Sequence, residues 1–186
     1  QGKDIDIINF IKIIKYVKFS MSRHNKKMAI NFEGQYSDPV HHPNFLKMLE
    51  LCFKYNVPAR VQHSSSAKPH SWYIKAFKIN PLAIWNFSID GLPKDSHKYR
   101  INQNGEKLFN VMKESTKHLH NKPSWQYIIF NYNENDINEA TKLANEIHVN
   151  FYTVQSGRWN IKTDNSYMPS EKYIIHKNEN ENEKKI

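Results

Sequence analysis

The sequence predicts an α/β protein built on a parallel sheet. Short apolar runs of the strand type alternate along the chain with longer runs that have helical spacing. This alternation is typical of parallel strands joined by right-handed crossovers. Several predicted strands end in polar or glycine-bearing segments, and the carboxyl ends of parallel strands open on one face, where ligands bind. We therefore expect distant segments to form one site: 33–39, 63–66, 88–91 and 155–159.

The predicted helices each place apolar residues on one side. In the first, Ile7, Phe10 and Ile14 share a side and lysines lie between them. Asn44 is a suitable N-cap for the second helix, and Pro58 follows its end. The pattern predicts helices over 4–19, 43–55, 71–77, 105–120 and 135–147, with a polar break at 22–27.

The predicted strands are short apolar runs bounded by turn signals such as Asp90-Gly91. They cover 28–32, 59–63, 82–89, 125–130 and 151–154. Beyond Trp159 the pattern fades, so we expect one domain over 1–160 and a polar tail over 161–186.

Composition narrows the range of partners. The net charge of +9 is compatible with an anionic partner, but the lysines are spread along the helices and no nucleic-acid motif is present, so we do not expect a dedicated nucleic-acid binder. Cys52 is the single cysteine, which excludes an internal disulfide and a cysteine-rich metal site within this chain. Because no leader and no long apolar run is visible, we expect a cytoplasmic protein without a membrane partner.

Polar residues after the first predicted strand are candidate ligand contacts. Asp38 precedes Pro39, and its carboxylate could bind an ammonium or hydroxyl group or could serve only the turn. His41 and His42 are adjacent, and adjacent side chains on a loop diverge, so a role in the loop is favoured over a shared metal ion.

Two further segments carry candidate residues. Ser88 and Asp90 are two positions apart, so both project to the same side of an extended strand and could bind the vicinal hydroxyls of a ribose; the alternative is a plain Asp-Gly turn. Arg158 could clamp a carboxylate or lie at the surface. Four aromatic residues could line a cavity, although core packing is the favoured role: Tyr36, Trp72, Trp125 and Trp159.

Taken together, these segments resemble the radical S-adenosylmethionine superfamily over about residues 3–160. In 34–45, glycine and the acid Asp38, where the family more often has Glu, precede His42-Pro43 and a helix. In 87–92, the Ser-Ile-Asp-Gly segment is followed by His97 and Arg100. The segments 63–66, 126–134 and 154–159 look like the family's third, fifth and sixth strand regions, although 63–66 lacks the family's Asn-Gly.

The resemblance implies a partial (β/α)6 TIM-like barrel of parallel strands with outer helices. It implies that Asp38 contacts the methionine amino group of S-adenosylmethionine and that Arg100 or Arg158 pairs with its carboxylate. It implies that Ser88 and Asp90 face the ribose and neighbouring polar groups, and that Ile128 and the backbone near Val154 lie by the adenine. Ser65, at the third strand tip, is a further implied cofactor contact.

The chain departs from the family in the cluster loop. The family's Cys-x3-Cys-x2-Cys loop binds a [4Fe-4S] cluster, whereas this chain has only Cys52 and begins at the family's first helix, without its first strand. Since one truncation explains both gaps, we expect a fragment that is inactive alone. At full length, the resemblance implies reductive cleavage to a 5′-deoxyadenosyl radical, an electron donor for the cluster, and hydrogen abstraction from an unknown small-molecule or peptide substrate.

Two other interpretations stay open. The chain could be a non-catalytic S-adenosylmethionine- or nucleotide-binding module that has no cluster at any length. It could also be an unrelated sugar- or nucleotide-binding α/β enzyme, in which case the candidate polar residues would not lie together.

Overall fold

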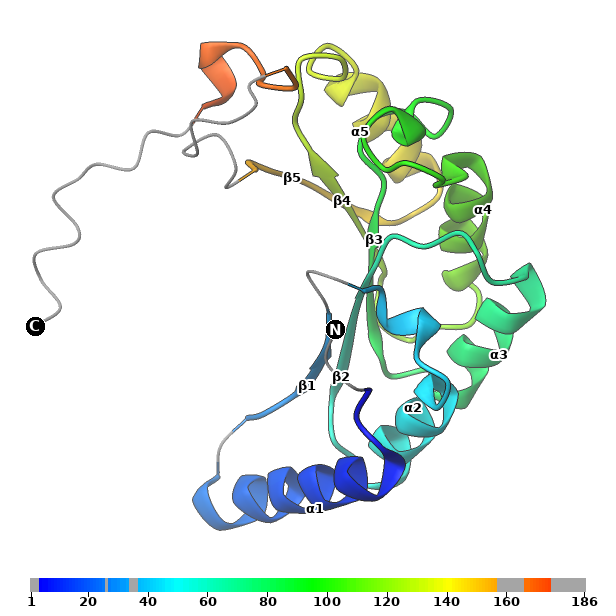
Figure 1. The fold of residues 1–186 in the computed structure, drawn as a ribbon, viewed down its shortest axis with the longest axis vertical. Coiled ribbons are helices and arrows are strands. Elements are labelled where there is room, and N and C mark those ends of the chain that lie inside the picture. Colours follow the sequence, from blue (N-terminus) through cyan, green and yellow to red (C-terminus); the bar gives the residue numbers. More distant parts are fainter. Residues whose placement is uncertain (1–3, 26, 34–36, 157–165, 175–186) are drawn as a thin grey trace, which may run out of the picture.

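A computed structural model describes residues 4–25, 27–33, 37–156 and 166–174, and it confirms the predicted parallel α/β fold. All pairings in the sheet are parallel, and the strands lie in chain order (Figure 1). The strands are β1 (Ile30–Phe32), β2 (Ala59–His63), β3 (Ile84–Ser88), β4 (Ser124–Ile128) and β5 (Asn150–Val154). The sheet is curved but not closed, since β1 and β5 are its two edges within the described residues.

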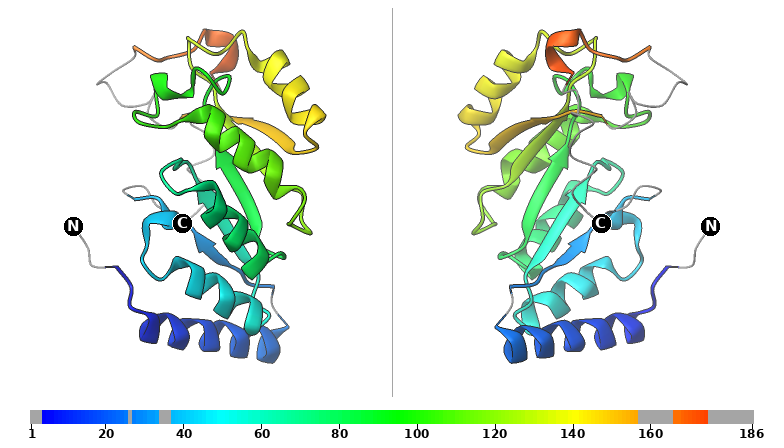
Figure 2. Two further views of the ribbon diagram at one scale, coloured as in Figure 1. Left: turned by 90° about the vertical axis from the view of Figure 1, so that its right-hand side faces the viewer. Right: turned by 90° about the vertical axis from the view of Figure 1, so that its left-hand side faces the viewer.

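The helices lie on the convex side of the sheet (Figures 1 and 2). They are α1 (Ile7–His24), α2 (Phe45–Lys54), α3 (His70–Ile79), α4 (Gly105–Ser115) and α5 (Ile137–Glu146), with short 3-10 turns η1 (Pro39–His41), η2 (Ser96–Lys98) and η4 (Glu171–Tyr173). Each of α2 to α5 connects two neighbouring strands. Within the described residues, no helix is both long enough and apolar enough to cross a bilayer.

The hydrophobic core lies between the helices and one face of the sheet. Trp85 of β3 and Trp125 of β4 are fully buried there. Phe45 and Phe77 from the helices pack against Trp85, and Phe109 of α4 packs against Trp125. Trp125 therefore packs in the core, as favoured for the aromatic residues. Trp72 packs against the core edge, whereas Tyr36 and Trp159 lie outside the described residues.

The concave face of the sheet carries polar side chains. Alternate strand residues point to it, and Arg60 is exposed while Gln62, Asn86 and Gln126 are half-buried. The Gln62 amide donates to Ser88 Oγ at 2.5 Å across this face. Parallel strands are usually covered and apolar on both faces, so this one-sided burial shows that the described helices cover only the convex side.

Several element boundaries differ from the expected ones. Helix α1 continues to His24 through the predicted polar break, because Met21 extends its inner apolar face and Asn25, with φ 48°, ends it. Helix α4 ends at Ser115 instead of His120, and a turn follows it over 116–118. The third and fourth strands are shorter than expected, and η4 lies within the expected tail.

Part of the predicted tail packs on the main body. The Asn131 N–H donates to the Tyr167 carbonyl at 3.2 Å, and the Tyr173 hydroxyl donates to the Glu134 carbonyl at 3.1 Å. The ring of Tyr167 also packs edge-on against that of Tyr99, with 5.7 Å between the ring centres. Residues 166–174 therefore extend the domain beyond the limit that hydrophobic periodicity suggested.

Gly105 is predicted to be intolerant of any side chain. A Cβ at this position would lie 2.1 Å from the Pro93 carbonyl oxygen and 2.9 Å from Ser96 Cβ, and neither backbone can withdraw without moving the loop before α4. We expect Gly105→Ala to lower the free energy of unfolding by about 3 kcal/mol, measured by chemical denaturation. Asn110→Ala, at an exposed position of α4, should change it little; equal effects of the two substitutions would contradict this packing.

Candidate functional site

A polar cavity of about 490 Å³ lies at the carboxyl ends of β1, β2 and β3. Three loops line it: the β1–η1 loop, the β2–α3 loop and the loop before α4. The lining residues are Ser37, Asp38, His41, Ser64, Ser65, Ser66, Ala67, Arg100, Ile101, Asn102 and Gln103. The volume is in the range of small-molecule sites, about 300–1,000 Å³. Asp38, Ser65 and Arg100, three residues singled out from the sequence, therefore share one cavity.

Asp38 joins the first two loops. It caps η1 by accepting the Val40 N–H at 3.1 Å, and its other oxygen accepts the N–H groups of Ser64 at 2.6 Å and Ser65 at 2.9 Å. A carboxylate accepts about four hydrogen bonds, so Oδ1, which accepts only the Val40 N–H among the described residues, has capacity for one further donor. Asp38 is thus both a turn residue and a candidate ligand contact, and the two sequence interpretations do not exclude each other.

Ser65 is fixed by its neighbours at the rim of the cavity. Its hydroxyl lies 3.1 Å from His41 Nε2 and accepts the Ala67 N–H at 3.2 Å, while its carbonyl accepts the Tyr73 hydroxyl at 2.6 Å. These contacts hold the serine-rich segment in one conformation without a glycine.

The adjacent histidines diverge, as expected for a loop. His41 contacts Ser65, whereas His42 bonds to the Ile5 carbonyl at 3.0 Å and accepts the Asn44 N–H at 3.0 Å. Asn44 stands at the N-cap of α2, but its side chain makes no capping hydrogen bond there, contrary to the expectation from the sequence. Among the described residues, no three His, Cys, Asp or Glu side chains form a group that could hold a metal ion.

Gln103 links the second and third loops and was not identified from the sequence. Its buried amide donates to the Ser64 carbonyl at 2.5 Å and to the Ser88 carbonyl at 3.0 Å, and it accepts from the Ser96 hydroxyl. Asn104 adds a bond from its N–H to Ser66 Oγ at 2.7 Å. The only signal for this role was the polar run just before α4.

Asp90 and Arg100 form an ion pair behind the cavity. Arg100 Nε lies 2.7 Å from Asp90 Oδ2, and Asp90 Oδ1 accepts the Ile128 N–H at 2.8 Å. Asp90 is completely buried. Burial raises the pKa of the Asp90 carboxyl above its ordinary value, although Arg100 and the Ile128 N–H both oppose that shift.

The remaining predicted residues are placed as follows. Ser88 lies beneath the cavity, with its hydroxyl accepting from Gln62, and is buried. Ile128 contributes its N–H to Asp90 and is half-buried at the end of β4. Arg158 lies outside the described residues. The structure thus links Asp38, Ser65, Ser88, Asp90, Arg100 and Ile128 through shared cavity lining and hydrogen bonds.

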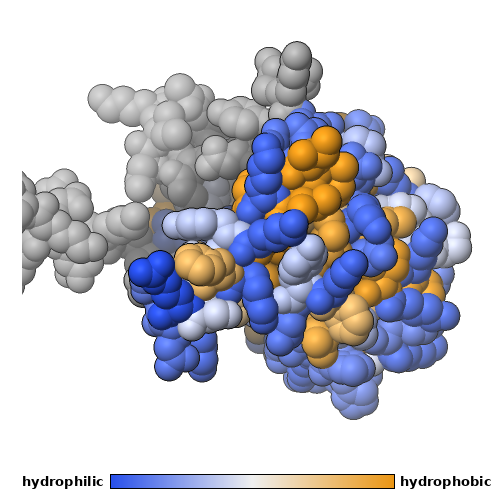
Figure 3. Space-filling view, turned by 90° about the horizontal axis from the view of Figure 1, so that it is seen from below, coloured by the Kyte–Doolittle hydropathy of each residue, from blue (hydrophilic) through white to orange (hydrophobic). Residues whose placement is uncertain are grey.

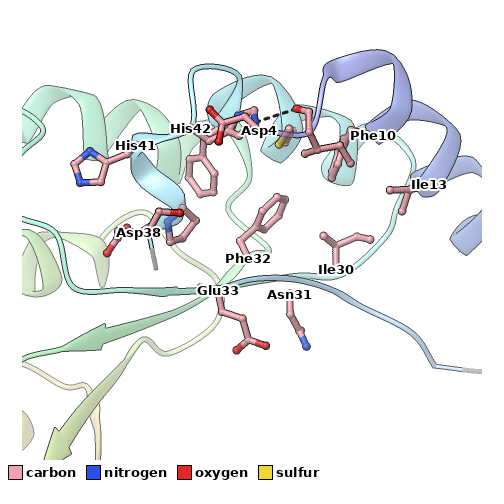
Figure 4. A pocket seen from close by; sticks show the side chains of 15 residues that line it. Asp4, Phe10, Ile13, Ile30, Asn31, Phe32, Glu33, Asp38, His41 and His42 are labelled. Carbon is pink, nitrogen blue, oxygen red and sulfur yellow. Dashed lines mark hydrogen bonds between the residues drawn. The ribbon is translucent and has the colours of Figure 1, made fainter. Parts of the chain in front are cut away.

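A second, more apolar cavity of about 370 Å³ adjoins the first. The two share Ser37, Asp38 and His41. Figure 4 shows Phe32 and Ile30 of β1 pointing toward α1 and the side of α2, while Asn31 and Glu33 point to the opposite face. A ligand in the polar cavity therefore has apolar space beside it, on the far side of Asp38.

Comparisons with known proteins give no match. No protein-family model fits this sequence, and no curated protein is significantly similar to it. The assignment of a function therefore depends on the geometry and on the sequence patterns alone.

His63 is predicted to make the fold sensitive to acid. Both ring nitrogens are buried without a hydrogen bond, and the rings of Phe87 and Trp85 lie 4.6 Å and 5.2 Å away. Burial lowers the pKa of His63 to about 4, so the unfolded chain takes up a proton more readily than the folded one as the pH falls below about 6.5. We expect this group to remove up to about 3 kcal/mol of stability between pH 6.5 and 4, measured by urea unfolding. In His63→Leu this part of the pH dependence should disappear; an identical pH profile would contradict the assignment.

The Arg100–Asp90 pair gives a prediction with the opposite pH dependence: the destabilisation caused by removing Arg100 should become smaller as the pH falls. Arg100→Met leaves the Asp90 carboxylate buried and unpaired, and we expect a loss of about 3 kcal/mol at pH 7, measured by urea unfolding. Because the orphaned carboxyl then binds a proton in the folded state, the loss should be smaller at pH 5. Lys98→Met, which breaks the exposed pair with Asp95, should cost less than about 1 kcal/mol at either pH. A loss for Arg100→Met that does not change with pH would exclude Asp90 as its cause.

Proposed function

We propose that the polar cavity at the ends of β1 to β3 binds S-adenosylmethionine and that this chain is the central part of a radical S-adenosylmethionine enzyme. The observation that carries the proposal is the convergence of Asp38 and Arg100 on one cavity. The two residues are about sixty positions apart in the chain and were chosen from separate motifs. The parallel sheet has its strands in chain order and its helices on the convex side, which supports a partial (β/α)6 barrel. A partial barrel is a more specific assignment than the open parallel α/β sheet described above.

The charges suit a zwitterionic ligand. Asp38 offers an anionic oxygen with a free lone pair to an ammonium group. Arg100 uses its Nε for Asp90, which leaves the outer guanidinium nitrogens for a carboxylate. In this proposal Asp90 and Ser88 hold the site from behind: the Asp90 carboxylate is completely buried and already bonded, so it orients Arg100 instead of contacting a ribose.

The donor set of this chain does not fit an iron–sulfur cluster. Cys52 is the single cysteine, it is buried in α2, and burial raises the pKa of its thiol to about 12. A cluster ligand is a thiolate, so Cys52 cannot serve as one. The proposal for this chain therefore ends at binding and orienting S-adenosylmethionine. Radical chemistry would require cluster ligands from outside this sequence. It would also require an electron donor and a small-molecule or peptide substrate, and we propose that it takes place in the cytoplasm.

A second candidate function is binding of S-adenosylmethionine or a nucleotide without catalysis. It is favoured by the same donor set, because nothing in the cavity requires a cluster for a ligand to bind. The two candidates share the cavity. The first requires that the methionine end of S-adenosylmethionine is recognised, whereas the second also admits a nucleotide that lacks it.

Ligand titration tests both candidates. We expect S-adenosylmethionine to bind saturably to the purified protein in isothermal titration calorimetry, and ATP to bind at least tenfold more weakly because it lacks the amino acid that Asp38 and Arg100 recognise. Ala67→Phe should fill the cavity and weaken binding at least tenfold without removing a hydrogen-bonding side chain.

Ser71→Phe, exposed on α3 outside the cavity, is the matched control and should leave binding unchanged. If S-adenosylmethionine does not bind at millimolar concentration, the proposal is wrong. If ATP binds as well as S-adenosylmethionine and Ala67→Phe weakens both, the cavity is a nucleotide site and the second candidate holds.

A further inference from the structure

Helix α1 exposes large apolar side chains that its packing does not require. Its inner face buries Phe10, Ile14 and Val17 in the core. On the outside, Ile8, Tyr16 and Phe19 are 66%, 68% and 57% exposed. Single exposed apolar residues are normal, but several on one helix indicate an interaction surface. Figure 3 shows orange apolar side chains gathered among blue hydrophilic ones on the side of the molecule that carries α1.

Cations share this outer face with the apolar residues. Ile8, Lys12, Lys15 and Phe19 follow one another at intervals of three or four residues and therefore lie along one side of the helix. Arg23 extends the row, with its guanidinium carbon 5.8 Å from the centre of the Phe19 ring. We call this set, with Tyr16, the outer α1 face.

The charge of this segment is entirely positive. Residues 7–32 contain no Asp or Glu, and they contain six basic residues: Lys12, Lys15, Lys18, Arg23, Lys26 and Lys27. Within the part of the chain that the structure describes, no ion pair joins Lys12, Lys15 or Arg23 to a carboxylate. These cations are therefore available to an anionic partner.

The combination of groups decides between anionic partners. The phosphates of a nucleic acid would pair with the cations of this face. They would not favour burial of the isoleucine and the phenylalanine that lie beside those cations. At a bilayer surface, apolar and aromatic side chains enter the interface while lysines reach anionic headgroups beside them. We propose that the outer α1 face docks on the surface of a bilayer that contains anionic phospholipids, with the helix lying in the plane of the interface.

This inference is independent of the proposed S-adenosylmethionine site. The finding that no described helix is long and apolar enough to cross a bilayer does not bear on this face. The expectation of no membrane partner considered only a leader and spanning segments. A helix lying on the surface needs no long apolar run, since its affinity comes from a few inserted side chains and from about 1 kcal/mol per cation near the headgroups. The polar cavity lies at the strand ends and does not include the outer α1 face.

Vesicle co-sedimentation tests the proposal with the whole chain. At 0.1 M NaCl we expect binding to vesicles of 30% phosphatidylserine in phosphatidylcholine and no binding to pure phosphatidylcholine. Lys12→Gln/Lys15→Gln should weaken binding about 30-fold, from about 1 kcal/mol per cation. Ile8→Ser/Phe19→Ser should weaken it about tenfold, because less apolar area enters the interface.

Matched controls separate this surface from general charge. Lys75→Gln/Lys78→Gln removes the same charge from exposed positions of α3 and should bind as the original chain does. Thermal unfolding of each variant establishes that it is folded. The proposal is wrong if vesicles with and without phosphatidylserine bind equally, or if the α3 variant loses as much as the α1 variant. It is also wrong if Ile8→Ser/Phe19→Ser has no effect while a 20-base-pair DNA duplex binds more tightly than the vesicles, which would identify a nucleic-acid surface.

Discussion

The fold depends on one constraint: every connection between neighbouring strands places its helix on the same face of the sheet. Adjacent parallel strands joined by crossovers of one hand can only be wound in this way. The apolar residues therefore collect between the convex face and the helices, around Trp85 and Trp125. None of the described helices covers the concave face, and its strands carry Arg60, Gln62 and Asn86 where two-sided burial would demand aliphatic residues.

The same winding brings all strand-to-helix loops to one rim, where polar side chains bind neighbouring backbones. Asp38 joins the first loop to the second, Gln103 joins the second to the third, and Asp90 joins the third strand to the fourth. In each link a buried or half-buried side chain bonds to main-chain groups of another strand end. Further contacts reinforce these links: Ser65 lies against His41, and the Asn104 N–H donates to Ser66 Oγ.

Much of the fold could be predicted from the sequence, because periodicity depends on which side of an element is buried. The positions of the five strands and the inner faces of the helices follow from that periodicity. Helix ends were less predictable, because Asn25 ends α1 through a left-handed backbone conformation that composition does not reveal. The packing of 166–174 on the body escaped detection, because its contacts are with residues far away in the sequence, such as the ring of Tyr99 and the N–H of Asn131.

The site was only partly predictable. Polar strand ends indicated the face on which the polar cavity lies, but a side chain's role depends on partners distant in sequence. Asp90 binds Ile128, which is 38 positions away, and Gln103 reaches Ser64, 39 positions away. No local pattern records such pairings. The resemblance that suggested S-adenosylmethionine supplied roles for single residues, and the comparisons with known proteins neither support nor oppose them.

The single cysteine makes the opening of the core measurable by thiol labelling. Cys52 is fully buried in α2, and burial raises the pKa of its thiol to about 12, so in the closed molecule neither access nor ionisation permits reaction with a thiol reagent. Labelling can proceed only when α2 separates from the sheet. Because no other thiol competes, the labelling rate of the natural chain reports how often this part of the core opens, without any substitution.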